Sequence, residues 1–210
     1  MEPLLALERP PRRRIFAYGG LAVWAVVCVL FGGALMVDHL VALPAPAATD
    51  AALHQMIATQ RRADQRGRWL VLHVIAESCG CSRRVLDHLL ADPRPGDVAE
   101  RVVFITEQPA TAATTLAAIR ARGFDLDVVT PDELGARYHI EAAPLLVVVD
   151  PGDRVRYVGG YTPRKQAADV RDLAMIAAVR RGEIVTPLPA FGCAIGRALR
   201  SKLDPLGIRN

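Results

Sequence analysis

The chain has 210 residues, of which 51% are hydrophobic, 23% charged and 5% aromatic, and its formal net charge at pH 7 is +4. That length accommodates one membrane segment and one domain of ordinary size. The small net charge, the lack of a basic run after residue 14 and the scarcity of aromatic residues exclude nucleic acid as a partner.

A long apolar segment near the N-terminus, residues 15–37, holds 23 residues without a charge. As a helix it would be about 35 Å long, which is enough to cross a hydrocarbon core of about 30 Å. It lacks the polar face at a period of 3.6 residues that a core helix of a globular protein would show. We therefore expect a transmembrane helix through which the protein meets the membrane.

The flanking charges predict the orientation of this helix. Arginines at positions 9, 12, 13 and 14 precede it, whereas Asp38 and His39 follow it. Because positive flanks stay in the cytoplasm, we expect a single-pass protein of the bacterial inner membrane with a cytoplasmic N-terminus and a periplasmic C-terminal domain. The alternative is a cleaved signal peptide, since Ala45-Pro46-Ala47 is a small-residue site, but the apolar run exceeds the usual length of about 7 to 15 residues.

Composition divides the chain into five regions. The Pro/Ala-rich stretch after the span predicts a semi-rigid linker. We expect a basic cytoplasmic tail at 1–14, the membrane helix at 15–37, the linker at 38–50, a folded domain at 51–186 and a C-terminal tail at 187–210 that contains Cys193.

Helical and strand-like patterns alternate along the domain. We expect helices at 50–65, 82–90, 111–122 and 164–181, and strands at 68–76, 101–106 and 124–130. Residues 130–133 (TPDE) begin a further helix with a capping box, and residues 150–153 (DPGD) are the turn of a β-hairpin. Alternating strands and helices require parallel crossovers, and the hairpin adds antiparallel pairing. The predicted fold is α/β, with a mixed four- or five-stranded sheet and helices on both faces.

Cys79 and Cys81 directly follow the apolar strand, at the point where a helix begins. The helix N-terminus stabilises a thiolate, and Arg83 and Arg84 add positive charge. A disulfide between two such close cysteines closes only a small ring, so it would stabilise the fold very little. Strain in that ring favours the two reduced thiols over the disulfide. Gly80 gives the backbone of the ring the freedom to form. We therefore interpret the pair as redox-active and expect the sulfur of Cys79 to be accessible and ionised.

Four other side chains have less defined roles. Glu77 is a candidate proton acceptor for Cys81, or an exposed acid at the helix start. His73 is expected to be a core histidine and His88 an exposed one. Cys28 should face lipid inside the span.

Cys193 is the odd thiol beyond the span, because pairing Cys79 with Cys81 leaves it alone. It is a candidate resolving cysteine, a third metal ligand or a competing partner for one of the other two thiols. The alternative is a small buried apolar residue in a loop.

Two stretches resemble the thioredoxin-like superfamily. They are "WLVLHVIAESCGCS" at 69–82, followed by a helix, and "EAAPLLVVVD" at 141–150, before a hairpin. In that fold the active cysteines follow the first core strand and a cis-proline precedes the next antiparallel strand. The resemblance implies that the Ala143–Pro144 bond is cis and lies across from Cys79, where Ala143 and Pro144 would dock a substrate strand.

A more specific resemblance is to membrane-anchored thioredoxin-like proteins of the RedB type. It rests on the Cys-x-Cys motif together with "TPDELGARY" at 130–138, "GGYT" at 159–162 and "FGC" at 191–193, and it covers about residues 67–195. The usual thioredoxin motif has two residues between its cysteines and an aromatic residue before the first. This chain has one intervening residue and Glu77-Ser78 instead, which argues against general thioredoxin activity.

The leading hypothesis is a membrane-anchored periplasmic thiol–disulfide oxidoreductase. Cys79 would attack, Cys81 would resolve the mixed disulfide, and Cys193 would be a third catalytic thiol. The redox-active disulfide would need no other cofactor, and the partners would be extracytoplasmic thiol or disulfide proteins. Glu77, Gly80 and Arg83 would support the site.

Two alternatives remain open. The first is a copper(I)-binding chaperone, since soft thiolates at Cys79, Cys81 and Cys193 suit a soft metal. The second is a membrane-anchored binding module that retains the fold without catalysis.

Overall fold

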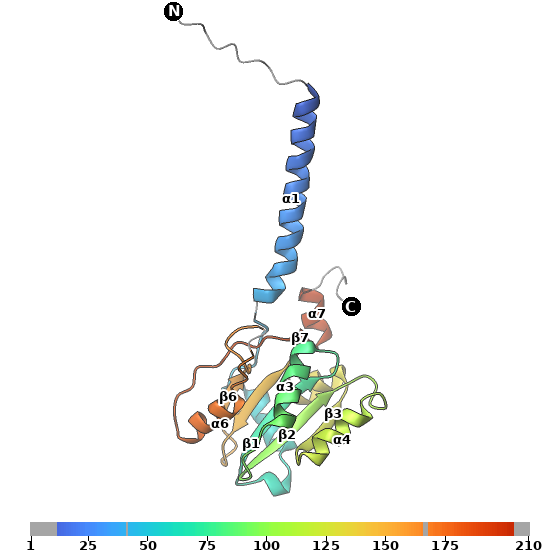
Figure 1. Ribbon diagram of the computed structural model, residues 1–210. Coiled ribbons are helices and arrows are strands. Elements are labelled where there is room, and N and C mark those ends of the chain that lie inside the picture. The colour runs from blue at the N-terminus through green and yellow to red at the C-terminus, as the bar shows by residue number, and fades with distance from the viewer. Residues whose placement is uncertain (1–11, 41, 166–167, 204–210) are drawn as a thin grey trace, which may run out of the picture. The chain divides into compact units, whose positions relative to one another are not determined.

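The computed structural model describes residues 12–40, 42–165 and 168–203. The chain divides into two units, Met1–Val41 and Ala42–Asn210. The first unit contains helix α1 (Arg12–Leu40), in which Phe16–Gly33 has a mean hydropathy of 1.9 and exposed side chains throughout. This helix is long and apolar enough to cross a membrane (Figure 1).

A five-stranded mixed sheet forms the centre of the second unit (Figure 1). Its strands are β1 (Trp69–Ala76), β2 (Val98–Ile105), β3 (Asp125–Val129), β5 (Leu145–Val149) and β6 (Val155–Gly159), in the order β3-β2-β1-β5-β6. The central strand β1 pairs parallel with β2 and antiparallel with β5. Its apolar run, interrupted only by His73, suits this position, because a central strand is buried on both faces. The predicted α/β class with a mixed sheet is confirmed.

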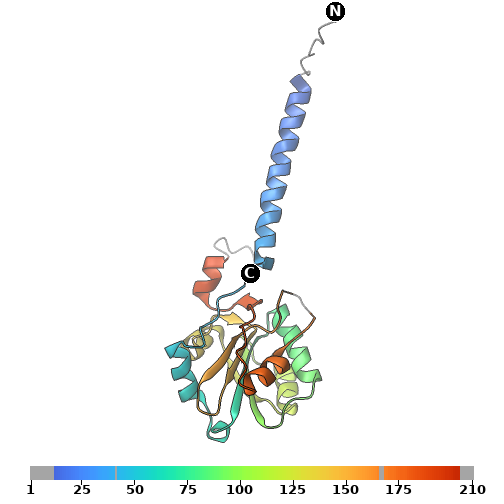
Figure 2. The same cartoon turned by 90° about the vertical axis from the view of Figure 1, so that its left-hand side faces the viewer.

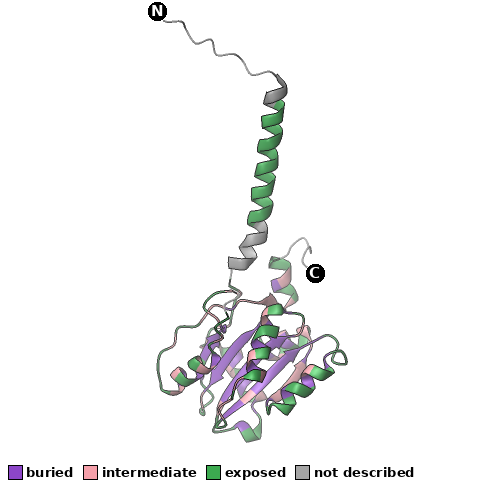
Figure 3. Cartoon of the chain, viewed as in Figure 1, coloured by how far each residue is buried: buried purple, intermediate pink, exposed green. Residues whose placement is uncertain are grey.

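Helices cover both faces of the sheet, so the strands lie buried between them (Figures 2 and 3). The helices are α2 (Ala51–Gln60), α3 (Gly80–Ala91), α4 (Ala113–Ala121) and α6 (Asp172–Arg180), with short turns η1 (Ala63–Gln65), α5 (Pro131–Glu133) and the π-helical η2 (Leu134–Tyr138). One core joins α3, α4 and α6 to Val71 and Ile75 of β1, and the other joins α2 and η2 to Leu70 and Leu72. Alternate residues of β1 enter different cores because side chains alternate across a strand.

Local signals predicted several element ends correctly. The hydroxyl of Thr130 accepts from the backbone N–H of Glu133 at 3.3 Å, and the Glu133 carboxylate accepts from the backbone N–H of Thr130 at 2.7 Å, so the predicted capping box begins α5. Gly123 and Gly182 follow α4 and α6 with φ of 91° and 81°. A left-handed residue after a helix is the conformation that favours glycine.

The start that the sequence predicts for the last helix is wrong. It was expected to begin at residue 164, but α6 begins at Asp172. The backbone N–H of Arg171 instead donates to the carbonyl of Tyr161 at 2.9 Å, which closes a loop after β6. This contact between distant parts of the loop overrides the local helical pattern.

The C-terminal segment belongs to the folded unit, which corrects the separate tail predicted at 187–210. Its strand β7 (Cys193–Ala194) pairs with β4 (Ala142–Ala143) in a two-stranded antiparallel sheet, and α7 (Arg197–Leu203) follows. Within the stretch predicted as a linker at 38–50, the backbone N–H of Leu43 donates to the carbonyl of Ala190 at 2.8 Å. The pairing partners lie far apart in the sequence, so local patterns could not reveal these boundaries. Residues 204–210 of the predicted tail lie outside the described residues.

The end of β6 packs tightly against this C-terminal segment. The backbone N–H of Gly160 donates to the carbonyl of Leu188 at 2.8 Å. A Cβ at Gly160 would lie 2.0 Å from the carbonyl oxygen of Pro189. Only glycine therefore allows the two backbones to approach this closely.

We expect Gly160→Ala to lower the free energy of unfolding by about 1–3 kcal/mol, the usual cost of overpacking a close contact. Gly80→Ala is the matched control, because a Cβ at Gly80 meets nothing within 4 Å. Thermal melting of the detergent-solubilised chain by circular dichroism measures both variants. Equal melting temperatures for Gly160→Ala and the unmodified protein would contradict the close packing.

Candidate active site

Cys79 lies at the junction of β1 and α3, where the chain changes from strand to helix. It is the N-cap residue of α3, with an extended backbone at φ −101° and ψ 117°. Its backbone N–H donates to the carbonyl of Ala76 at 3.2 Å, and the hydroxyl of Ser82 accepts from the backbone N–H of Ala76 at 3.1 Å. These bonds turn the chain so that the Cys79 sulfur lies over the first turn of the helix.

The three cysteines of the second unit gather at this junction. Cys81 lies in the first turn of α3 and Cys193 on β7, and both pack, partly buried, against the core that contains Cys79. Hydrogen bonding by the thiol of Cys193, and then by the thiol of Cys81, lowers the pKa of Cys79 far below its ordinary value of 9.0, although burial opposes this. Cys79 is therefore the thiolate of the group.

The other two thiols remain protonated. Their hydrogen bonds to the Cys79 thiolate raise the pKa of both Cys81 and Cys193 above 9.0, and burial acts in the same direction. These pKa shifts favour a state in which Cys79 is ionised and the other two thiols are protonated. A hydrogen bond to a charged acceptor is stronger than a neutral one, which explains why this arrangement holds the charge.

The helix N-terminus contributes less than the sequence suggested. The backbone N–H and the hydroxyl of Ser82 lower the pKa of Cys79, but both effects follow those of the two thiols. Arg83 and Arg84 are exposed, and neither is among the main causes, whereas Arg84 lowers the pKa of Cys81. The contribution of the buried Ser82 was not predicted from the sequence. Its position, third in the helix, is the only signal there that could have indicated it.

The expectation that the sulfur of Cys79 is accessible is wrong for this structure. Cys79 has 0% exposed surface. Its Sγ lies 3.7 Å from the carbonyl oxygen of Ala143, and Ala143 in turn is paired with Cys193 of β7. The C-terminal segment, which the sequence could not place, forms part of the cover.

Glu77 and Gly80, two of the predicted supporting residues, have surroundings that the sequence did not predict. The carboxylate of Glu77 accepts a short hydrogen bond from the hydroxyl of Thr106 at the end of β2, so this acid is fixed at the edge of the site. Gly80 occupies a helical position with open space around it, so its backbone freedom is not used in this thiol state. Whether Glu77 accepts a proton from Cys81 stays a prediction.

Ala143 and Pro144 lie beside the thiolate, on the short strand β4 and directly before β5. The peptide bond between them is cis, which is the geometry that the resemblance implied. The carbonyl of Ala143 faces Cys79, as described above, and the backbone of Ala143 pairs with Cys193. The two residues thus bring together the cysteines of α3 and the cysteine of β7.

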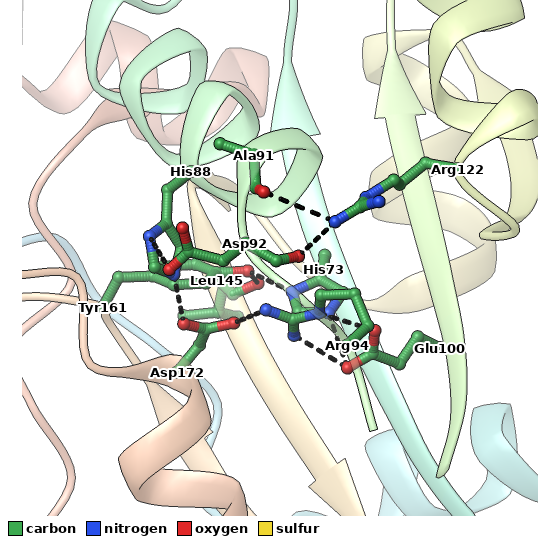
Figure 4. Close-up of polar contacts among 10 residues, drawn as sticks. All are labelled: His73, His88, Ala91, Asp92, Arg94, Glu100, Arg122, Leu145, Tyr161 and Asp172. Carbon is green, nitrogen blue, oxygen red and sulfur yellow. Dashed lines mark hydrogen bonds and ion pairs between the residues drawn. The ribbon is translucent and has the colours of Figure 1, made fainter. Parts of the chain in front are cut away.

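A buried polar network lies in the other core, beneath α3 (Figure 4). Arg94 donates to both oxygens of Glu100 at 2.7 and 2.8 Å and pairs with Asp172 at 2.7 Å. His73 contacts the hydroxyl of Tyr161 at 3.0 Å, and that hydroxyl donates to the carbonyl of Leu145 at 3.3 Å. Because Leu145 follows Pro144, the network supports the start of β5, directly after the proline.

Of the predictions for the two histidines of this network, one is confirmed and one is wrong. His73 is a fully buried core residue, as predicted. His88 is half-buried and its Nε2 lies 2.8 Å from a carboxylate oxygen of Asp172, so the prediction of an exposed histidine is wrong. The buried role of Asp172 was not predicted from the sequence, because its partners Arg94 and His88 lie on distant segments.

Among the described residues, no group of three or more His, Cys, Asp or Glu side chains is arranged to hold a metal ion. The three thiols predicted as copper(I) ligands pack against the same core, but they do not form an arrangement of side chains that could hold a metal ion in the described part of the chain. The copper hypothesis thus gains no support from the geometry.

The described elements form an α/β domain with a five-stranded mixed sheet and a cysteine at the N-terminus of the first helix after the central strand, which is the arrangement that the thioredoxin-like resemblance implied. No family model matches the chain, and no curated protein matches it in sequence. Among solved structures, an uncharacterized conserved protein from Geobacillus kaustophilus is similar with a TM-score of 0.49 and 17% identity, covering 63% of this chain and 78% of that one. A hypothetical protein from Sinorhizobium meliloti 1021 has a TM-score of 0.46 and 23% identity, covering 62% and 80%.

A third similar structure is the thioredoxin domain of a thiol-disulfide oxidoreductase from Bacteroides vulgatus. Its TM-score is 0.38 with 14% identity, covering 57% of this chain and 81% of that one. Such distant likenesses give no information about activity, and the fold assignment depends on the described elements themselves.

We expect Cys79 to remain a thiolate in mildly acidic solution, because its pKa is lowered. Cys193→Ala should raise that pKa, since it removes the hydrogen bond with the largest effect. The thiolate absorbance in the far ultraviolet, followed against pH, measures the change. Cys28→Ala on α1 is the control and should leave the titration unchanged; an unaltered titration of Cys193→Ala would contradict the stabilisation of the thiolate by Cys193.

Acid stability tests the buried network. Burial alone would raise the pKa of Glu100, but the hydrogen bonds and charges of His73 and Arg94 outweigh it and lower the pKa from 4.5 to about 2. The stability due to Glu100 is thus fully present above about pH 4.5 and is lost as the pH falls toward 2, by on the order of 2–3 kcal/mol.

Glu100→Gln should flatten this loss while lowering stability at neutral pH, because it leaves the charge of Arg94 without its full partner. The exposed Glu107→Gln is the matched control and should keep the original pH profile. Denaturant unfolding at a series of pH values measures both variants. An unchanged acid profile in Glu100→Gln would show that other groups control acid stability.

Proposed function

We propose that the chain is a membrane-anchored thiol–disulfide oxidoreductase of the extracytoplasmic space, of the kind that the RedB-type resemblance suggests. The observation that supports it best is the placement of Cys79 at the start of α3, with Cys81 in the first turn of that helix and Cys193 packed against the same core; the lowered pKa of Cys79 and the raised pKa values of the other two thiols agree with it. Thiol–disulfide exchange needs one thiolate to attack and a second thiol to resolve the mixed disulfide. A cluster with one ionised and two protonated thiols holds both.

The reaction has two steps. The thiolate of Cys79 attacks one sulfur of a substrate disulfide, forms a mixed disulfide and releases a substrate thiolate, which takes up a proton. A second thiol of the cluster, Cys81 or Cys193, loses its proton and attacks the sulfur of Cys79. The substrate leaves as a second thiol, so two electrons pass from the protein to the substrate, and the reverse sequence oxidises a dithiol.

The compartment follows from the membrane helix and its flanks. Residues 16–33 form a helix that is long and apolar enough to span a membrane. Its N-terminal flank carries arginines, whereas Asp38 and His39 lie in its C-terminal flank. This asymmetry supports a cytoplasmic N-terminus and a periplasmic domain in a bacterial inner membrane. Disulfides persist in that compartment, so thiol or disulfide proteins there are the proposed partners.

Trapping in the membranes of cells that produce the full chain tests the proposal. The double variant Cys81→Ser, Cys193→Ser should accumulate mixed disulfides between Cys79 and exported proteins, because no thiol remains near Cys79 to resolve them. These adducts should disappear on reduction. They are measured as shifted bands on non-reducing gels.

The control adds Cys79→Ser to the double variant and should show none of these bands. Adducts that are equally abundant with and without Cys79 would refute the proposed activity.

A further inference from the structure

The strand β7 extends the edge of the active site like an added substrate strand. Its residues pair antiparallel with β4, with Cys193 opposite Ala143 and Ala194 opposite Ala142. The pairing continues beyond the strand, since the backbone N–H of Ile195 donates to the carbonyl of Glu141 at 2.7 Å. The backbone groups of this edge are therefore already satisfied within the chain.

The register of this pairing decides which residue meets the thiolate. The carbonyl oxygen of Ala143 lies 3.7 Å from the sulfur of Cys79. Any extended segment that pairs with β4 in this register brings the residue opposite Ala143 beside that sulfur. In the structure that residue is Cys193, whose thiol has the largest effect in lowering the pKa of Cys79.

The residue before Cys193 shows how close the fit is. A Cβ at Gly192 would lie 1.9 Å from the carbonyl oxygen of Ala143 and 2.5 Å from Cδ of Pro144. No real side chain tolerates these distances, so the backbone approaches the proline only because this residue is glycine. The segment is also fixed further upstream, where Leu43 bonds to Ala190.

Cys81 is placed less favourably to close a bond with Cys79. It belongs to the first helical turn, one residue beyond Gly80, and a bond between the two cysteines would close a very small ring inside that turn. A bond between Cys79 and Cys193 instead closes a loop that includes most of the folded unit. Longer loops give the larger stabilisation of the folded state.

We propose that β7 occupies the substrate-docking edge in place of a substrate, and that Cys193 is the thiol that resolves the mixed disulfide on Cys79. This inference depends on the proposed thiol–disulfide exchange. A substrate strand enters when β7 leaves β4, and the return of β7 brings Cys193 to the sulfur of Cys79 while it displaces the product.

The chemistry balances with a substrate disulfide as the oxidant. The thiolate of Cys79 breaks the substrate S–S bond and forms a mixed disulfide, and one substrate sulfur leaves as a thiolate that takes up a proton. Cys193 then loses its proton, attacks the sulfur of Cys79 and forms the Cys79–Cys193 bond, releasing the second substrate thiol. The hydrogen bond to the Cys79 thiolate, which raises the pKa of Cys193, is absent once that sulfur is in the mixed disulfide.

The same geometry defines a substrate class. A peptide that docks as β7 does must place a glycine directly before its reacting cysteine, because the space at that position is filled by Ala143 and Pro144. The preferred substrate is thus an extended segment containing Gly-Cys in a disulfide.

The first experiment maps the disulfide that forms during one turnover. The reduced, detergent-solubilised full chain reacts with a synthetic Gly-Cys peptide disulfide, is quenched with an alkylating reagent, and is digested for mass spectrometry. We expect a Cys79–Cys193 bond as the main internal product, and its continued formation in Cys81→Ser. In Cys193→Ser the peptide–Cys79 adduct should persist at least ten times longer.

The outcomes separate the two proposals. A Cys79–Cys81 bond as the main product, with rapid loss of the adduct in Cys193→Ser, would overturn the role of Cys193 and leave the proposed function standing. No adduct on Cys79 in any variant would overturn both. Circular dichroism melting of each variant confirms that the compared proteins are folded.

The second experiment compares two peptides that differ only before the cysteine. With Cys193→Ser protein, an Ala-Cys peptide disulfide should form the Cys79 adduct at least ten times more slowly than the Gly-Cys peptide. Equal rates would overturn the docking register and the substrate class.

Discussion

The hydrogen bonds that the thiols of Cys81 and Cys193 donate to the thiolate of Cys79 are the interaction on which the candidate site depends. A buried charge is costly unless it is paired or strongly hydrogen-bonded, and Cys79 has no exposed surface to share its charge with water. Two sulfur donors and the Ser82 groups at the start of α3 supply that stabilisation. The site is therefore a property of three segments together, and a Cys-x-Cys motif alone would not produce it.

The sheet topology explains how these segments meet. The central strand β1 ends at Ala76, and α3 begins immediately after Cys79, so Cys79 and Cys81 lie at one end of the sheet. The short strand β4 precedes β5, which pairs with β1, and this brings Ala143 to the same end. The glycines at 160 and 192 then let the C-terminal segment approach the backbones of β6 and β4 closely enough to place Cys193.

The two cores contribute differently. The core shared with α2 contains Cys79, whereas the charged network of Arg94, Glu100 and Asp172 lies on the other side of the sheet, beneath α3. Through Tyr161 this network contacts the carbonyl of Leu145, the residue that follows Pro144. The network thereby fixes the backbone at the start of β5, directly after Pro144.

The sequence by itself determined the long apolar helix near the N-terminus, the alternation of strands and helices, the capping box at Thr130 and the position of Cys79 at a helix start, because each depends on contacts between neighbours in the chain. Only the tertiary structure decided that Cys79 is buried, that Cys193 lies opposite Ala143, that the C-terminal tail is part of the domain, and that His88 pairs with Asp172. These features depend on pairing between residues that are far apart along the chain. No local periodicity encodes the register between β4 and β7. It is fixed only when the backbones approach each other closely, which the absence of a Cβ at Gly160 and Gly192 allows.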